Sequence, residues 1–85
     1  MEELYRLIED KISQSGCPLK IDGKEFYQDV SNEADEKENG SYLFLIKKSE
    51  DVVYEGTMDI MDDDFDLHIV KIHFNNEVYE IDFDA

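Results

Sequence analysis

The chain has 85 residues, of which 23 are Asp or Glu and 8 are Lys or Arg, so its formal net charge at pH 7 is −15. Charge of this sign argues against nucleic acid and anionic membranes as direct partners and favours a basic protein surface. The length predicts one domain covering residues 1–85. Five Phe and five Tyr provide large side chains for a folded core and argue against wholesale disorder.

The compartment is predicted from the cysteine content and the N-terminus. Cys17 is the sole cysteine, so no internal disulfide can form, which is typical of a reducing compartment. Residues 1–10 are acidic and amphipathic, without the basic region and apolar run of a signal peptide. No apolar run approaches the length that spans a bilayer. We therefore expect a cytoplasmic protein.

The first predicted element is a helix over residues 2–15. Apolar side chains recur there at helical spacing, at Leu4, Leu7, Ile8 and Ile12. Gly16 and Pro18 follow at positions where helices commonly end. The apolar stripe predicts that this helix covers one face of a sheet.

Two short strands are predicted next. Asp22-Gly23 is a frequent hairpin dipeptide, so residues 19–21 and 24–30 are expected to pair antiparallel. Residues 31–40 contain no large apolar side chain and carry four carboxylates against Lys37. This composition predicts an exposed acidic loop.

A second hairpin is predicted from residues 41–48 and 51–61, joined at Ser49-Glu50. This register places Tyr42, Phe44 and Ile46 on one face, together with Glu55. One helix covers one face of a sheet, which leaves two alternatives. Either the three apolar side chains form an exposed patch of the kind that marks a partner surface, or they pack under the 31–40 loop. Otherwise the register differs by one residue, or the sheet curls around both faces.

The third hairpin, residues 66–74 and 77–84, turns at Asn75-Asn76. Asn tolerates positive φ, as a two-residue type I′ turn requires. With Phe74 opposite Glu77, one face is largely apolar and includes His68. The other face carries a row of carboxylates, formed by Glu80, Asp82 and Asp84.

These elements predict an α+β fold. One N-terminal helix is expected on one face of a five- or six-stranded, mainly antiparallel, meander-like sheet.

We expect neither a metal site nor a cofactor. Asp62, Asp64 and Asp66 match positions 1, 3 and 5 of a calcium loop, but Leu67 stands where the loop requires Gly and His73 where it requires Glu. His68 and His73 are five residues apart, so a regular strand directs them to opposite faces.

Catalysis is not expected either. Carboxylates are too numerous for any pair to indicate acid–base chemistry, which needs dissimilar environments in a cleft. Cys17 follows a helix, where the dipole disfavours a thiolate. The sequence contains no catalytic motif, and we expect a protein that is not an enzyme.

The acidic surface points to a binding protein that inhibits a basic, nucleic-acid-binding protein by occupying its Lys/Arg-rich site. Small acidic anti-CRISPR and other phage anti-defence proteins are similar in size and charge, a likeness of composition that covers no motif. The candidate partner-binding residues are Glu33, Asp35, Glu36, Glu38, Tyr42, Phe44, Asp62, Asp63, Asp64, Glu80, Asp82 and Asp84.

The spacing of these carboxylates limits the hypothesis. Alternate residues on one strand place a charge every ~6.7 Å, about fourfold sparser than the charge along DNA. Nucleic-acid mimicry therefore requires Asp62–Asp64 and the 31–40 segment to lie on the same side as the row formed by Glu80, Asp82 and Asp84. Two alternatives remain: an immunity or adaptor protein that neutralises another basic partner such as a toxin, or a homodimer formed through an exposed sheet face or edge.

Overall fold

The computed structural model describes residues 2–62 and 64–84, and within them two helices precede four strands. The elements are α1 (Glu2–Gln14), α2 (Gly23–Asp35), β1 (Gly40–Lys47), β2 (Val52–Met61), β3 (Asp64–Phe74) and β4 (Glu77–Asp82). The strands form one antiparallel sheet in the order β1-β2-β3-β4. The α+β class and the antiparallel meander are confirmed, whereas one helix and five or six strands were wrong.

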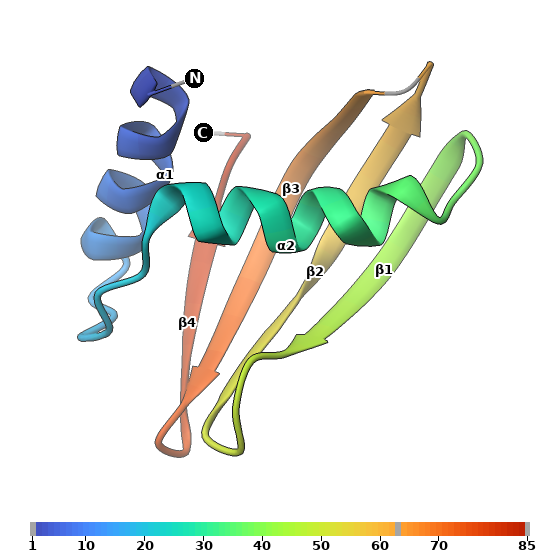
Figure 1. The fold of residues 1–85 in the computed structure, drawn as a ribbon. Helices are drawn as coiled ribbons and strands as arrows, with labels where there is room; N and C mark the ends of the chain where they lie inside the picture. The colour runs from blue at the N-terminus through green and yellow to red at the C-terminus, as the bar shows by residue number, and fades with distance from the viewer. Residues whose placement is uncertain (1, 63, 85) are drawn as a thin grey trace.

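Helix α2 crosses one face of the sheet, and α1 lies beside α2 along β4 (Figure 1). Ile8 and Ile12 of α1 are buried, but Leu4 is 36% and Leu7 50% exposed. The Lys11 Nζ donates a hydrogen bond to the Asp82 carbonyl at 3.2 Å. The predicted first helix is therefore present, although it packs against α2 and the edge of the sheet instead of covering the sheet.

The predicted hairpin at Asp22-Gly23 is wrong, because Asp22 is the N-cap of α2. Its side chain accepts a hydrogen bond from the Lys24 N–H at 2.9 Å, as capping aspartates do. Phe26, Val30 and Ala34 follow at four-residue spacing, and all three are buried. The predicted strands 19–21 and 24–30 are thus absent, and the predicted 31–40 loop is helical as far as Asp35.

Ion pairs and ring contacts hold α2 across the sheet. Lys48, just after β1, lies 2.6 Å from Asp29 and 2.8 Å from Glu25. Hydrogen bonds to Asp29 and then Glu25 raise the Lys48 pKa well above its ordinary value. In the core, the ring of Phe26 contacts those of Tyr54, at 5.2 Å between centroids, and Phe83, at 6.0 Å.

The β1–β2 hairpin has a register one residue away from the predicted one. Lys47 pairs with Val53 and Phe44 with Gly56, and the Lys48 N–H donates to the Val52 carbonyl at 2.9 Å, so the turn takes three residues (49–51) instead of two. Side-chain direction alternates along a strand, so this shift exchanges the two faces of β1. Phe44 is 4% exposed in the core, while Tyr42 and Ile46 pack partly buried against it. The predicted patch of these three residues is therefore not a surface.

The β3–β4 hairpin follows the predicted register. Asn75 and Asn76 have φ of 55° and 65°, as a type I′ turn requires. The cross-strand pairs run from Phe74–Glu77 to Ile69–Asp82. The Phe83 N–H then donates to the His68 carbonyl at 2.8 Å, which extends the pairing beyond β4.

A β-bulge interrupts the pairing of β2 with β3. Gly56 pairs with Val70 and Met58 with Leu67, so His68 and Ile69 both stand opposite Thr57. The bulge turns His68 to the face away from the helices, where its ring bonds to Asp59. The predictions that His68 lies on the apolar face, and that it and His73 point to opposite faces, are both wrong for this reason.

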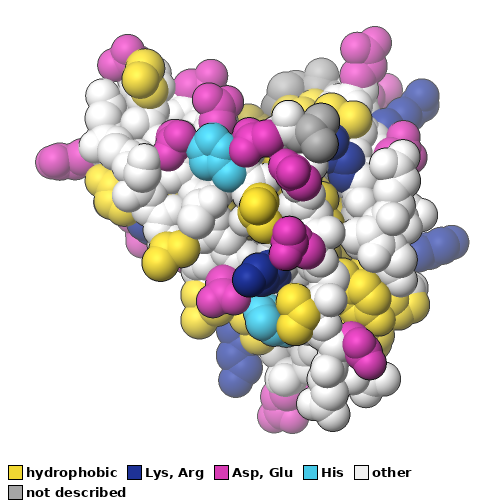
Figure 2. Space-filling view, turned by 180° about the vertical axis from the view of Figure 1, so that it is seen from behind, with side chains coloured by type: hydrophobic (Ala, Val, Ile, Leu, Met, Phe, Trp, Pro, Cys, Tyr) yellow, Lys and Arg dark blue, Asp and Glu magenta, His cyan; other side chains and the backbone are white. Residues whose placement is uncertain are grey.

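We call the side of the sheet away from the helices the open face. By strand alternation from the buried residues, its side chains are Ser41, Leu43, Leu45, Lys47, Val53, Glu55, Thr57, Asp59, Met61, Asp66, His68, Ile69, Lys71, His73, Val78, Glu80 and Asp82. Neither described helix covers this face, and Figure 2 views it directly.

Candidate functional site

The loop after α2 and the turn between β2 and β3 lie side by side at one end of the sheet. The Asp62 N–H donates to the Asn39 Oδ1 at 3.0 Å, and the Asn39 Nδ2 lies 3.5 Å from the Asp62 Oδ1. Asp62 has φ of 51°, a left-handed conformation that Asp tolerates better than most residues. Two segments 23 residues apart in sequence are thereby joined.

Two shallow hollows on either side of this junction bring acidic side chains together. One, of about 570 Å³, is lined by Asp35, Glu38 and Asp64. The other, of about 830 Å³, is lined by Asp59, Asp62, Asp64 and Asp66. We call these carboxylates the acidic end: Asp35, Glu38, Asp59, Asp62, Asp64 and Asp66. The one cation among the described residues that line either hollow is Lys37.

Lys37 does not neutralise this group through an ion pair among the described residues. Its Nζ donates to the Glu33 carbonyl at 3.1 Å and lies 5.9 Å from the centre of the Tyr42 ring. Both contacts direct the side chain toward the end of α2 and the start of β1. The acidic end therefore presents a clear excess of negative charge.

Asp59 and Asp66 stand directly opposite each other on β2 and β3. Like charges in this position destabilise a strand pair. Asp59 is compensated by the Ser41 hydroxyl and by the Nε2 of His68, each at 2.6 Å. These hydrogen bonds, Ser41 first, lower the Asp59 pKa. Asp66 is exposed and has no comparable hydrogen bond among the described residues.

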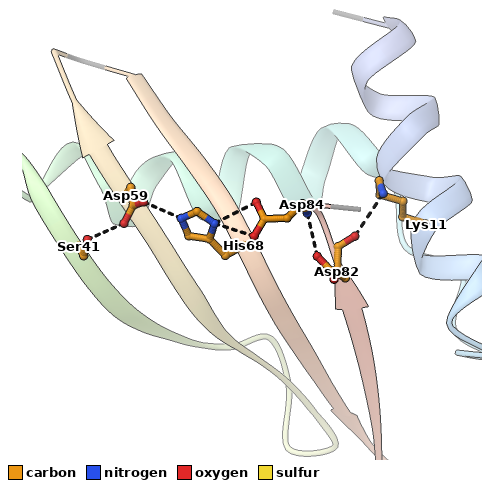
Figure 3. Close-up of polar contacts among 6 residues, drawn as sticks. All are labelled: Lys11, Ser41, Asp59, His68, Asp82 and Asp84. Carbon is orange, nitrogen blue, oxygen red and sulfur yellow. Dashed lines mark hydrogen bonds and ion pairs between the residues drawn. The ribbon is translucent and has the colours of Figure 1, made fainter.

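Each ring nitrogen of His68 contacts a carboxylate. The Nε2 faces Asp59, and the Nδ1 lies 2.9 Å from an Asp84 oxygen. Because both nitrogens can donate only in the imidazolium, Asp59 and then Asp84 raise the His68 pKa. Figure 3 shows the chain of contacts that results: Ser41, Asp59, His68 and Asp84 cross the sheet, and Asp82 leads on to Lys11.

The open face also carries exposed apolar side chains. The exposed fraction is 78% for Leu43, 63% for Leu45, 53% for Val78 and 39% for Ile69. A hollow of about 460 Å³ crosses the strands here, lined by Leu43, Thr57 and Ile69 among polar neighbours. Figure 2 shows apolar side chains on this face interspersed with carboxylates and both histidines.

The predicted site residues fall into several groups. Asp35, Glu38, Asp62 and Asp64 come together, whereas Glu33 and Glu36 line neither hollow. Glu80, Asp82 and Asp84 lie along the open face and its margin. Phe44 is buried and Tyr42 partly buried, so neither presents a free apolar surface. Asp63 lies outside the described residues.

Sequence reasoning missed six residues of these surfaces: Asp59, Asp66, Leu43, Leu45, Ile69 and Val78. The alternation of β1 contained the signal for the leucines, since shifting the register by one residue exposes them. For the aspartates, the signal was their position as outward residues flanking the Asp62–Asp64 turn.

The described residues form neither a candidate metal site nor a helix that could span a membrane. Within 2–62 and 64–84, no three His, Cys, Asp or Glu side chains are arranged to hold a metal ion. Neither helix in these ranges has the length and apolar character needed to cross a membrane.

Comparison of the chain with protein-family models, with curated proteins and with solved structures gave no match.

Proposed function

We propose that this protein is a non-enzymatic, cytoplasmic inhibitor that binds a basic, nucleic-acid-binding protein and occupies its Lys/Arg-rich site, as an anti-CRISPR or other anti-defence protein would. The observation that supports the proposal best is the junction of Asn39 with Asp62, which gathers acidic side chains from α2, its following loop and the β2–β3 turn. The charges on a single strand are too far apart to resemble nucleic acid. This junction brings together carboxylates of α2, of the loop that follows it and of the β2–β3 turn.

The electrostatics of the whole chain favour the same mechanism. A net charge of −15 attracts a basic surface over the Debye length, about 8 Å at physiological ionic strength, and so speeds association. The acidic end then supplies carboxylates as hydrogen-bond acceptors for Lys and Arg, in the place that phosphates would take. Binding is expected to weaken as salt is added.

The test is the release of nucleic-acid-binding proteins from immobilised DNA or RNA. A lysate of the native cell is loaded on the column, the protein is added, and the eluate is identified by mass spectrometry. The triple variant Glu38→Gln/Asp62→Asn/Asp64→Asn should release at least tenfold less of the eluted protein. The matched control, Glu2→Gln/Glu3→Gln/Asp10→Asn on α1, removes the same number of charges and should release it normally.

Two results would contradict the proposal. One is the absence of any released protein beyond what polyglutamate of equal charge releases. The other is an equal loss of release in both triple variants, which would mean that total charge alone acts.

The acidic end also suits an immunity or adaptor protein whose basic partner is, for example, a toxin. Affinity capture from the native cell separates the two functions. A captured toxin that does not bind nucleic acid, and whose capture requires Asp62 and Asp64, would favour this alternative.

A further inference from the structure

The open face differs from an ordinary solvated sheet face. An antiparallel sheet with one face in water normally alternates apolar residues inward and polar residues outward. Here Leu43 and Leu45 of β1 and Val78 of β4 point outward and are more than half exposed. Exposed apolar side chains gathered on one face commonly mark an interaction surface.

The β-bulge shapes a hollow at the middle of this face. It places His68 and Ile69 on the same side of β3, and His68 folds back onto Asp59 and Asp84. Ile69 remains in the hollow with Leu43 and Thr57, so that the lining reaches from β1 to β4. Bulges frequently re-aim side chains beside functional sites.

The dimensions of the face suit one helix. Three spacings between four strands of about 4.8 Å give a width of about 14 Å, which a helix of about 10 residues spans at a rise of about 1.5 Å per residue. On the opposite face, the 13 residues of α2 cross the same four strands (Figure 1). A helix of about 10–14 residues would cover the open face in the same way, with apolar residues at positions i, i+3 or i+4, and i+7.

The charge of the open face determines which charge a bound helix would carry. Its carboxylates outnumber its basic side chains even when both histidines are counted: Glu55, Asp59, Asp66, Glu80, Asp82 and, at the margin, Asp84 stand against Lys47, Lys71, His68 and His73. Glu80 stands across from Lys71 in the strand register. A second copy of this chain would present the same negative face and a net charge of −15, so self-association is disfavoured.

We propose that the open face binds a cationic amphipathic helix of a partner protein. Apolar side chains of the helix would contact Leu43, Ile69 and Val78, and its Lys or Arg side chains would pair with Glu80 and Asp82 at the rim. This inference does not depend on the displacement of nucleic acid, because it concerns another surface and its test contains no nucleic-acid-binding protein.

The probe is a synthetic 14-residue helical peptide of Leu and Lys, with the apolar residues on one side. We expect saturable binding by calorimetry and chemical-shift changes confined to the methyl groups of Leu43, Leu45, Ile69 and Val78. A Leu/Glu peptide of the same pattern should not bind. Binding of both peptides, or shifts spread over α1 and α2, would overturn the proposal.

Two variant pairs test which residues act. Leu43→Ser/Leu45→Ser should weaken binding of the Leu/Lys peptide at least tenfold, because both side chains are exposed and their loss spares the core. The matched control is Leu4→Ser/Leu7→Ser, which removes two exposed leucines from α1 and should change the affinity less than twofold. An equal loss in both pairs, with folding verified by circular dichroism, would refute the assignment.

Charge and self-association are tested in the same way. Glu80→Gln/Asp82→Asn should weaken peptide binding more than Glu2→Gln/Glu3→Gln on α1 does, and the reverse order would contradict the rim contacts. A dimer of the wild type in sedimentation, absent in Leu43→Ser/Leu45→Ser, would overturn the proposal. It would mean that a second copy of the chain, and not a partner helix, covers the open face. The triple variant of the acidic end should retain at least one third of the peptide affinity, which separates this inference from the inhibitor function.

Discussion

Gly23 lies where the first turn of α2 meets the backbone of α1, and we expect Gly23→Ala to destabilise the protein. A Cβ there would lie 2.2 Å from the Tyr5 carbonyl oxygen, about 1.2 Å closer than the 3.4 Å at which ordinary contact begins. The atom in the way is backbone, so the two helices must separate. The result is the opposite of the usual one, because Ala in a helix is about 1 kcal/mol more favourable than Gly.

The magnitude follows from two losses. Forcing an extra carbon into a packed contact costs about 1–3 kcal/mol. Separating the helices also weakens the bond from the Gly23 N–H to the Glu9 Oε2 at 2.8 Å, a charge-assisted contact worth about 1.5–3 kcal/mol. Offset by the helix preference of Ala, the net loss is about 1.5–5 kcal/mol. A chain of this length has roughly 4–13 kcal/mol of stability in total.

Urea unfolding followed by far-UV circular dichroism measures the effect. The midpoint should fall by about 1–2 M with little change in slope, given m of about 1–3 kcal/mol/M for small proteins. The control is Asn32→Ala, an exposed position of the same helix, which should raise stability by about 0.5 kcal/mol. A Gly23→Ala protein as stable as the wild type would refute the close approach of the two helices.

Three further predictions concern the cap, the histidine and salt. Asp22→Ala should cost about 1 kcal/mol of stability, measured by the same urea unfolding, because the Lys24 N–H loses its acceptor. His68 has a raised pKa, so its contribution to stability is present below about pH 6.5 and is lost as pH rises through the raised pKa. The difference in stability between wild type and His68→Asn should therefore shrink from pH 6 to 9. A constant difference would contradict the ion pairs. Finally, 0.5 M NaCl should raise the thermal midpoint by screening repulsion among the charges of a −15 chain, and a lower midpoint would contradict that reasoning.

The sequence predicted best where the determining interactions are local. The Asn75-Asn76 turn fixes its own hairpin, and both residues adopt the positive φ that the turn needs. Asp22-Gly23 is also a local signal, but it is typical both of hairpins and of helix N-termini. The four-residue spacing from Phe26 to Ala34 was the observation that could have decided between them.

The register of β1 was harder to predict because its strand is apolar on both faces. With leucines and aromatic residues alternating, either face could be buried, so the turn length decided the outcome. Gly56 provides the reason in the structure. A Cβ there would lie 2.9 Å from the Phe44 ring and 2.8 Å from the Ile69 carbonyl. The missing side chain admits Phe44 to the core and leaves Leu43 and Leu45 outside.

The acidic end depends on contacts that cannot be predicted from the sequence. Asn39 and Asp62 are distant in sequence, and no periodicity indicates that they bond. The bulge at His68 and Ile69 likewise is seen only in the pairing of β2 with β3, since each strand alone reads as regular. Composition thus identified the kind of surface, and tertiary contacts determined which carboxylates share it.

A substitution in the Asp59–Asp66 pair can distinguish an effect on folding from an effect on binding. Ser41 and His68 compensate Asp59, whereas exposed Asp66 keeps its repulsion toward the opposite strand. A Lys or Arg of a partner would relieve this repulsion on binding. Asp66→Asn should therefore raise stability by about 0.5 kcal/mol while it reduces release of the basic partner from immobilised nucleic acid. Asp10→Asn, an exposed site on α1, should do neither to the same degree. An Asp66→Asn variant that loses both stability and release would show that Asp66 serves folding alone.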